Sequence, residues 1–113
     1  MSIWEVGPAQ SVYLLRWKVY EIEAGVRHLV GWDVDGFQGR VSSEIAVWDP
    51  SEFKVITKSG RIYTLVGPSR GDSTAEYVWN RWKDIWGYDH YNQIDVSEEY
   101  IGEEISKDDD TVL

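Results

Sequence analysis

The stretch FKVITKSGRIYTLV, residues 53–66, gives the clearest structural signal in this chain. Two runs rich in β-branched and aromatic residues flank Ser59-Gly60, and such a loop is typical of a tight β-hairpin. If Lys58 pairs with Arg61, one face of the hairpin is uncharged and is expected to point to the core. That face comprises Phe53, Val55, Thr57, Ile62, Thr64 and Val66, and the opposite face comprises Lys54, Ile56, Lys58, Arg61, Tyr63 and Leu65.

Three further strands are predicted before the hairpin. Residues 12–21 alternate in the manner of a strand. One side carries Tyr13, Leu15, Trp17 and Val19, and the other carries Val12, Leu14, Arg16, Lys18 and Tyr20. Residues 26–34 form a second strand that ends at the turn pair Asp35-Gly36. A third strand covers residues 40–48 and stops before Pro50, because proline lacks the amide hydrogen that a central strand needs.

One helix is expected after the Gly67-Pro68 break. Residues 73–76 fit a capping box, with Ser73 as N-cap and Glu76 bonding back to its amide. Gly87 stands where a left-handed C-terminal cap is expected. The apolar stripe comprises Ala75, Val78, Trp79, Trp82, Ile85 and Trp86, and its three tryptophans should be buried against the sheet. The sequence thus predicts an α+β fold, a five-stranded antiparallel β-meander curved around one helix from the C-terminal half.

Charge is concentrated at the C-terminal end of the chain. Residues 89–113 hold nine acids and one base, a net charge of −8. Residues 1–88 hold eleven acids and ten bases, a net charge of −1, and the two parts sum to −9. We therefore expect a single α+β domain over residues 1–88, followed by an acidic and partly docked extension over residues 89–113.

Composition excludes several classes of protein. The absence of cysteine rules out disulfides, cysteine–zinc sites and thiol catalysis, and fits a reducing cytoplasm. No apolar run reaches the roughly 18 residues of a membrane span. The first residues lack the pattern of a secretory signal, so a cytoplasmic protein without membrane contact is expected.

Motifs for catalysis or metal binding are weak. His28 is expected to be a structural or surface residue, and no spacing joins it to His90 in a metal-binding motif. No nucleophile-elbow sequence accompanies the Asp89-His90 pair. Residues 33–36 resemble the start of a calcium loop, but its later ligands are missing and a turn explains them. We expect no enzymatic activity, cofactor or metal; a small enzyme built from scattered acids and His90 is a third hypothesis.

Cations alternate with aromatic rings along the expected outer strands. An exposed sheet face with this pattern holds single-stranded nucleic acid by stacking and charge. The residues concerned are Arg16, Lys18, Tyr20, Lys54, Lys58, Arg61 and Tyr63. The negative charge of the whole chain opposes phosphate binding. This face is therefore the alternative hypothesis, with the acidic extension competing for it as a regulator.

Three segments resemble small uncharacterised proteins of proteobacteria and of their phages and plasmids. They are residues 39–43 (GRVSS), 59–68 (SGRIYTLVGP) and 75–82 (AEYVWNRW). The resemblance covers about residues 17–86 and implies no site residues. Small, acidic, cysteine-free proteins from that setting are also typical of anti-CRISPR inhibitors and toxin-immunity proteins, a resemblance of class alone.

The leading hypothesis is a non-enzymatic inhibitor whose acidic surface blocks a basic surface of a nucleic-acid-handling protein or complex. Carboxylates would stand in for phosphates, as in a DNA mimic, and aromatic rings would anchor the contact. The expected contact residues are Asp95, Glu98, Glu99, Tyr100, Glu103, Glu104, Asp108, Asp109 and Asp110. The sequence does not identify the partner or the oligomeric state.

Overall fold

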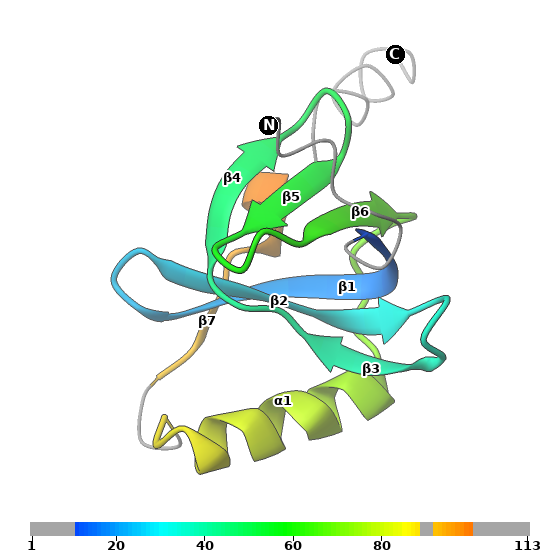
Figure 1. The fold of residues 1–113 in the computed structure, drawn as a ribbon. Coiled ribbons are helices and arrows are strands. Elements are labelled where there is room, and N and C mark those ends of the chain that lie inside the picture. Colours follow the sequence, from blue (N-terminus) through cyan, green and yellow to red (C-terminus); the bar gives the residue numbers. More distant parts are fainter. Residues whose placement is uncertain (1–10, 89–91, 101–113) are drawn as a thin grey trace, which may run out of the picture.

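The computed structural model describes residues 11–88 and 92–100. Predictions made for residues 1–10, 89–91 and 101–113 lie outside the described residues. The described part contains one seven-stranded sheet, one α-helix and a short 3-10 helix (Figure 1). The fold is therefore α+β with a mostly antiparallel sheet, as predicted, but it has seven strands in place of five.

The central strand of the sheet is the first one. The strands are β1 (Ser11–Glu23), β2 (Val26–Asp33), β3 (Gln38–Val41), β4 (Ile45–Asp49), β5 (Lys54–Thr57), β6 (Ile62–Val66) and β7 (Ile94–Asp95). Helix α1 spans Ser73–Ile85, and the 3-10 helix η3 spans Ser97–Tyr100. The order across the sheet is β3-β2-β1-β6-β5-β4, and β7 also pairs with β1. β1 runs antiparallel to β2 and β7 but parallel to β6, so the predicted meander is wrong at this pair.

The predicted third strand is two strands separated by residues 42–44. β3 pairs with β2 at one edge of the sheet, whereas β4 pairs with β5 at the other edge. Because so short a link joins opposite edges, the sheet curls on itself, as Figure 1 shows. Ser42 holds the bend: its amide donates to Leu29 O at 2.9 Å, and its hydroxyl accepts from the Leu29 amide at 2.8 Å.

A β-bulge interrupts β1. Arg16 and Trp17 together oppose the single residue Gly31 on β2. Arg16 adopts a φ of 47°, in the left-handed region that non-glycine residues rarely occupy. Gly31 fits this site because a Cβ there would lie 2.8 Å from the Leu14 Cγ atom. The bulge therefore depends on a residue without a side chain on the facing strand.

The bulge changes which side chains of β1 face the inside of the curled sheet. The inner core contains Val12, Leu14, Trp17, Val19, Leu29, Val55, Tyr63, Leu65, Val96 and Tyr100. Val12 and Leu14 precede the bulge, and Trp17 and Val19 follow it, so the strict alternation predicted over residues 12–21 is wrong. An extra residue shifts a two-residue alternation by one. Even-numbered side chains therefore face the inner core before the bulge, and odd-numbered side chains face it after the bulge.

The β5–β6 hairpin is present with a register that differs by one residue from the prediction. The Thr57 amide donates to Arg61 O at 3.1 Å, so Thr57 takes the place expected for Lys58. The loop is residues 58–60, and Gly60 closes it with a φ of 90°. The shift reverses the faces of β6: Tyr63 and Leu65 are buried with Val55, and Val66 is exposed.

Helix α1 packs on the outer face of the curled sheet, below β2 and β3 in Figure 1. A second apolar cluster lies there, made of Tyr20, Ile22, Val30, Ala75 and Trp79. The sheet is therefore curved around its own core, and the prediction that it curves around the helix is wrong. The reason is that β1 is buried on both faces, so one face needs the curl and the other needs the helix.

The ends of α1 match the prediction in part. The N-cap is Asp72, whose Oδ2 atom accepts from the Ala75 amide at 3.0 Å, and not Ser73. Glu76 accepts a hydrogen bond from the Tyr20 hydroxyl at 2.5 Å in place of completing a capping box. Gly87 has a φ of 79°, which confirms the left-handed conformation expected after the helix.

The tryptophan stripe of α1 is only partly buried. Trp79 is fully buried and Trp82 is half-buried, but Trp86 is 66% exposed and Ile85 is 70% exposed. Helical spacing marks one side of a helix, but contact with the sheet ends before the last turn of α1. The prediction of three buried tryptophans is therefore wrong for Trp86.

Trp79→Ala should lower the free energy of unfolding by about 3–5 kcal/mol, because it leaves a cavity at a fully buried position. Trp86→Ala on the same helix is the matched control, and its exposed ring should cost no more than about 0.5 kcal/mol. Urea denaturation followed by circular dichroism measures both values. Equal losses for the two variants would contradict the packing of α1 described above.

Candidate functional site

The first acids of the C-terminal segment are held against the centre of the sheet. β7 pairs with β1, and the Val96 amide donates to Val19 O at 2.9 Å. The Val19 amide in turn donates to the Ser97 hydroxyl at 2.9 Å. Val96 and Tyr100 belong to the inner core. Residues 94–100 are therefore built into the fold of the body, and η3 begins from a fixed position.

Arg27 on β2 holds η3 from the side. Its Nε atom donates to Glu21 Oε1 at 2.9 Å, and its Nη1 and Nη2 atoms donate to the two Glu99 oxygens at 2.8 and 3.3 Å. Nη1 also donates to the Tyr100 hydroxyl at 3.3 Å, and the guanidinium lies 5.8 Å from the Tyr100 ring centroid. Hydrogen bonds to Glu99, Tyr100 and Glu21 stabilise the charged guanidinium and therefore raise the pKa of Arg27.

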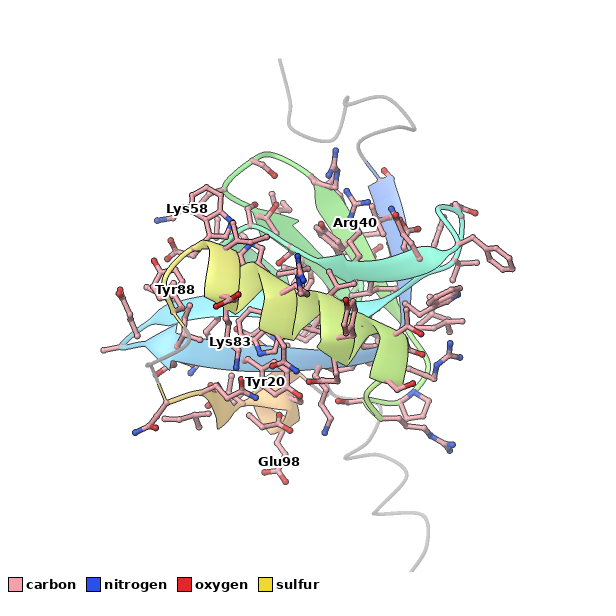
Figure 2. The ribbon with its side chains drawn as sticks, turned by 90° about the horizontal axis from the view of Figure 1, so that it is seen from below. Tyr20, Arg40, Lys58, Lys83, Tyr88 and Glu98 are labelled. Carbon is pink, nitrogen blue, oxygen red and sulfur yellow. The ribbon has the colours of Figure 1, made fainter. Side chains whose placement is uncertain are left out.

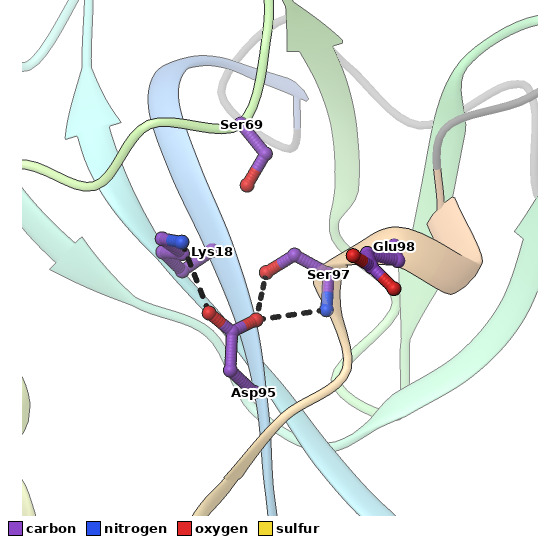
Figure 3. Close-up of a pocket in the computed structure, with 5 residues that line it drawn as sticks. All are labelled: Lys18, Ser69, Asp95, Ser97 and Glu98. Atoms are coloured by element: carbon purple, nitrogen blue, oxygen red, sulfur yellow. Dashed lines mark hydrogen bonds and ion pairs between the residues drawn. The ribbon is translucent and has the colours of Figure 1, made fainter.

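Asp95 organises a shallow, open depression of about 410 Å³ (Figure 3). Its Oδ1 atom accepts from the Ser97 amide at 2.9 Å, and its Oδ2 atom accepts from Lys18 Nζ at 2.9 Å. Burial alone would raise the pKa of Asp95, but the hydrogen bonds from Ser97 and Lys18 outweigh it and lower that pKa. Ser69, across the depression, donates to Trp17 O at 2.7 Å. Lys18 and Ser97 are thus bonded to Asp95, Ser69 is bonded to the backbone of β1, and we assign no reaction to these groups.

The described members of the expected acidic contact set have different roles. Tyr100 is 5% exposed and serves the core, so it is not a surface anchor. Asp95 and Glu99 are ion-paired, although the Glu99 side chain stays 57% exposed. Glu98 is exposed and points away from the body (Figure 2). Glu103, Glu104, Asp108, Asp109 and Asp110 lie outside the described residues.

The residues of the alternative nucleic-acid face do not form one exposed surface. Tyr20 and Tyr63 are 7% and 2% exposed and belong to different clusters, because α1 covers Tyr20 and the hairpin register turns Tyr63 inward. Burial and the hydrogen bond to Glu76 raise the pKa of Tyr20. These two rings cannot stack on bases, so the pattern of cations and rings read from the sequence does not describe a stacking face.

The cations of that face are also engaged. The ion pairs are Arg16–Asp72, Lys18–Asp95, Lys54–Glu52 and Lys58–Glu44, with nitrogen–oxygen distances of 2.8, 2.9, 3.8 and 3.0 Å. Arg61 is half-buried, and its Nε atom has no hydrogen-bond partner within the part of the chain that the structure describes. A ligand phosphate would have to displace a carboxylate at each of the four pairs.

His28 is a structural residue at the interface between sheet and helix. Its ring centroid lies 4.7 Å from that of Trp82 and 5.9 Å from that of Trp79, and its Nδ1 atom donates to Ser42 O at 2.9 Å. Burial lowers the pKa of His28 from its ordinary value and so favours the neutral ring. His90, the other histidine of the sequence, lies outside the described residues.

Within residues 11–88 and 92–100, no group of three or more His, Cys, Asp or Glu side chains is placed to hold a metal ion. No helix in the same ranges has the length and apolarity needed to cross a membrane. Comparison with known protein families, with curated proteins and with solved structures finds no match to this chain.

Sequence reasoning missed the residues that anchor η3. Arg27 and Val19 stand inside strands, where nothing in the local pattern marks them as contacts of a segment some 70 residues later. The one local signal was Ser97, which is a favourable residue at the start of a helix. Its hydroxyl bonds both to Asp95 and to β1, and only the second contact fixes the segment to the body.

Arg27→Met should loosen η3, because the substitution keeps an apolar stem but removes the bonds to Glu99 and Tyr100. We expect the free energy of unfolding to fall by about 1–3 kcal/mol and the Val96 amide to exchange faster with solvent. Arg81→Met, at an exposed position on α1, is the control. Hydrogen–deuterium exchange measures the effect, and an unchanged exchange rate at Val96 would show that Arg27 does not hold the segment.

Proposed function

We propose that this protein is a non-enzymatic binding protein that blocks a basic surface of a nucleic-acid-handling partner with its acidic C-terminal segment. The observation that carries the proposal is the anchored start of that segment. Glu98 and Glu99 are exposed on η3, while Tyr100 of the same turn is fixed in the core. The acids at residues 103–110 follow directly from this fixed point in the sequence.

The charges of the body support the proposal because its cations are largely occupied. Five ion pairs join cations to carboxylates within residues 11–88: Arg16–Asp72, Arg27–Glu21, Arg40–Asp33, Lys54–Glu52 and Lys58–Glu44. Lys18 and Arg27 also pair with Asp95 and Glu99 of the segment that carries −8 of the net charge of −9, so the described part of the body compensates only part of its charge. A segment that stays net acidic attracts a basic surface over a distance and speeds encounter with it.

The carboxylates would take the place of nucleic-acid phosphates on the partner. The cytoplasm is where such a partner would be met. An anti-CRISPR inhibitor is the sharpest form of this proposal, and a toxin-immunity protein is the next. Because Tyr100 is buried, the contact must draw on carboxylates first, and any aromatic anchor must come from elsewhere on the surface.

Two variants with equal net charge test the proposal. The first replaces Glu103, Glu104, Asp108 and Asp109 by the corresponding amides, and the second replaces the exposed body residues Glu23, Glu52, Asp35 and Asp84 in the same way. We expect only the first variant to lose capture of a basic protein from host lysate at low salt, with melting temperatures close to that of the parent. Mass spectrometry identifies the captured protein.

The captured protein should be released by duplex DNA and by about 0.5 M salt, because salt shortens the range of charge attraction to a few ångströms. Equal capture by both variants would contradict the proposal. Truncation is a poorer test if it begins at Asp95, since it would remove Val96 and Tyr100 from the core and confuse unfolding with lost binding.

A further inference from the structure

His28 is a buried histidine at the place where β2 meets α1. Its side chain is 5% exposed and lies beside the second apolar cluster. Histidine is the side chain whose ordinary pKa lies closest to neutral pH, and the sequence has no cysteine to titrate near it. A proton taken up by His28 would therefore place a charge inside a packed interface at a pH only slightly below neutral.

The two sides of the His28 ring respond differently to a proton. The Nδ1 atom donates to Ser42 O at 2.9 Å, and this bond survives protonation because a protonated ring donates from both nitrogens. The ring also lies against the Trp82 and Trp79 rings of α1, at centroid distances of 4.7 and 5.9 Å. The cost of burying the charge therefore falls on the contact with α1, while the bend at Ser42 is kept.

The titratable groups of β1 and α1 near His28 are already bonded. Tyr20 pairs with His28 across the two strands, and its hydroxyl donates to Glu76 of α1 at 2.5 Å. Lys83 of α1 donates to Gln93 Oε1 at 2.6 Å, and as a cation it opposes a second positive charge nearby. These groups offer little stabilisation to a protonated imidazole.

The groups beyond the bend favour the protonated ring, but less strongly than burial opposes it. Glu44 is the nearest carboxylate on that side, and it is ion-paired with Lys58 at 3.0 Å. Burial is the largest influence on the pKa of His28 and lowers it, whereas the bond to Ser42 O and the charge of Glu44 raise it. The packed interface thus favours the neutral ring.

The two ends of α1 are attached to the sheet by different contacts. Asp72 caps the N-terminal end and is ion-paired with Arg16 of β1 at 2.8 Å. The C-terminal half rests on Trp82, whose ring lies against His28 and stacks with Tyr88 at a centroid distance of 5.6 Å. The last residues of the helix are exposed. A disturbance at His28 therefore acts on the C-terminal half of α1 alone.

We propose that His28 is a pH-sensitive latch, whose protonation at mildly acidic pH releases the C-terminal half of α1 from β2 while the N-terminal half stays attached. This inference does not depend on the proposed partner. Above the ordinary histidine pKa of about 6.5 the latch is closed. As the pH falls below that value, a ring freed from the interface binds a proton more readily than a packed ring, so the open population rises. Opening uncovers Val26 and Val41, which pack against the same cluster.

Amide hydrogen exchange of the full chain, followed by NMR at about pH 7.5 and about pH 5.5, tests the latch within the range where histidine titrates. Each rate is divided by the intrinsic rate at the same pH. We expect the protection of residues 82–86 to fall about tenfold at the lower pH, the change that one unit of pKa difference produces. Residues 76–79 of the same helix should keep their protection. The resonances of the His28 ring should titrate with the same midpoint as the loss of protection.

Three variants identify the group that titrates. His28→Phe keeps a ring at this position, and His28→Asn keeps a donor for Ser42 O, but neither side chain takes up a proton in this range. Both should show equal protection of residues 82–86 at the two pH values. His90→Gln removes the other histidine of the sequence and should behave as the parent does.

Constant protection of residues 82–86 in the parent at the two pH values would overturn the proposal. So would an equal loss along the whole helix, a loss that persists in a folded His28 variant, or a loss that His90→Gln abolishes. If neither His28 variant folds, the parent alone decides, because different midpoints for the His28 ring and for the protection of residues 82–86 would overturn the proposal equally.

Discussion

The bulge at Arg16 and Trp17 is the constraint on which the rest of the structure depends. β1 contacts β2, β6 and β7, so the direction of its side chains fixes both faces of the sheet. The extra residue places the apolar side chains of both halves of β1 in one inner core. Gly31 permits this arrangement, because any side chain there would meet Leu14. The inner core and the face offered to α1 both follow from this one irregularity.

The two halves of β1 support different surfaces of the protein. The second half of β1 holds the acidic segment through the amide and carbonyl of Val19, which is fully buried. The first half of β1 carries the apolar outer face that α1 does not reach. The central strand thus anchors residues 94–100 with its second half and carries apolar outer side chains on its first half.

Several features were predictable from the sequence because their causes are local. The helix, the glycine after it, the position of the hairpin and the concentration of acids each depend on neighbouring residues. The bulge was not predictable, since one residue in a left-handed conformation leaves no mark in an apolar alternation. The prediction of the hairpin register was wrong because Ser59-Gly60 is compatible with both a two-residue and a three-residue loop. The parallel β1–β6 pair and the hydrogen bonds from Arg27 to η3 depend on contacts between distant segments.

Thermal unfolding of a Gly31→Val variant tests the role of the bulge most directly. A Cβ atom at residue 31 would lie 2.8 Å from the Leu14 Cγ atom and 3.0 Å from Leu15 O, so this side chain is incompatible with the bulge that faces it. Without the bulge, regular alternation of the full-length strand would place Trp17 and Val19 on the face opposite to Val12 and Leu14. The account predicts that this variant has no cooperative unfolding transition. Arg16→Gly, which keeps the bulge and suits a φ of 47°, should unfold cooperatively near the temperature of the parent. A Gly31→Val variant that melts cooperatively at the parent's temperature would contradict the account.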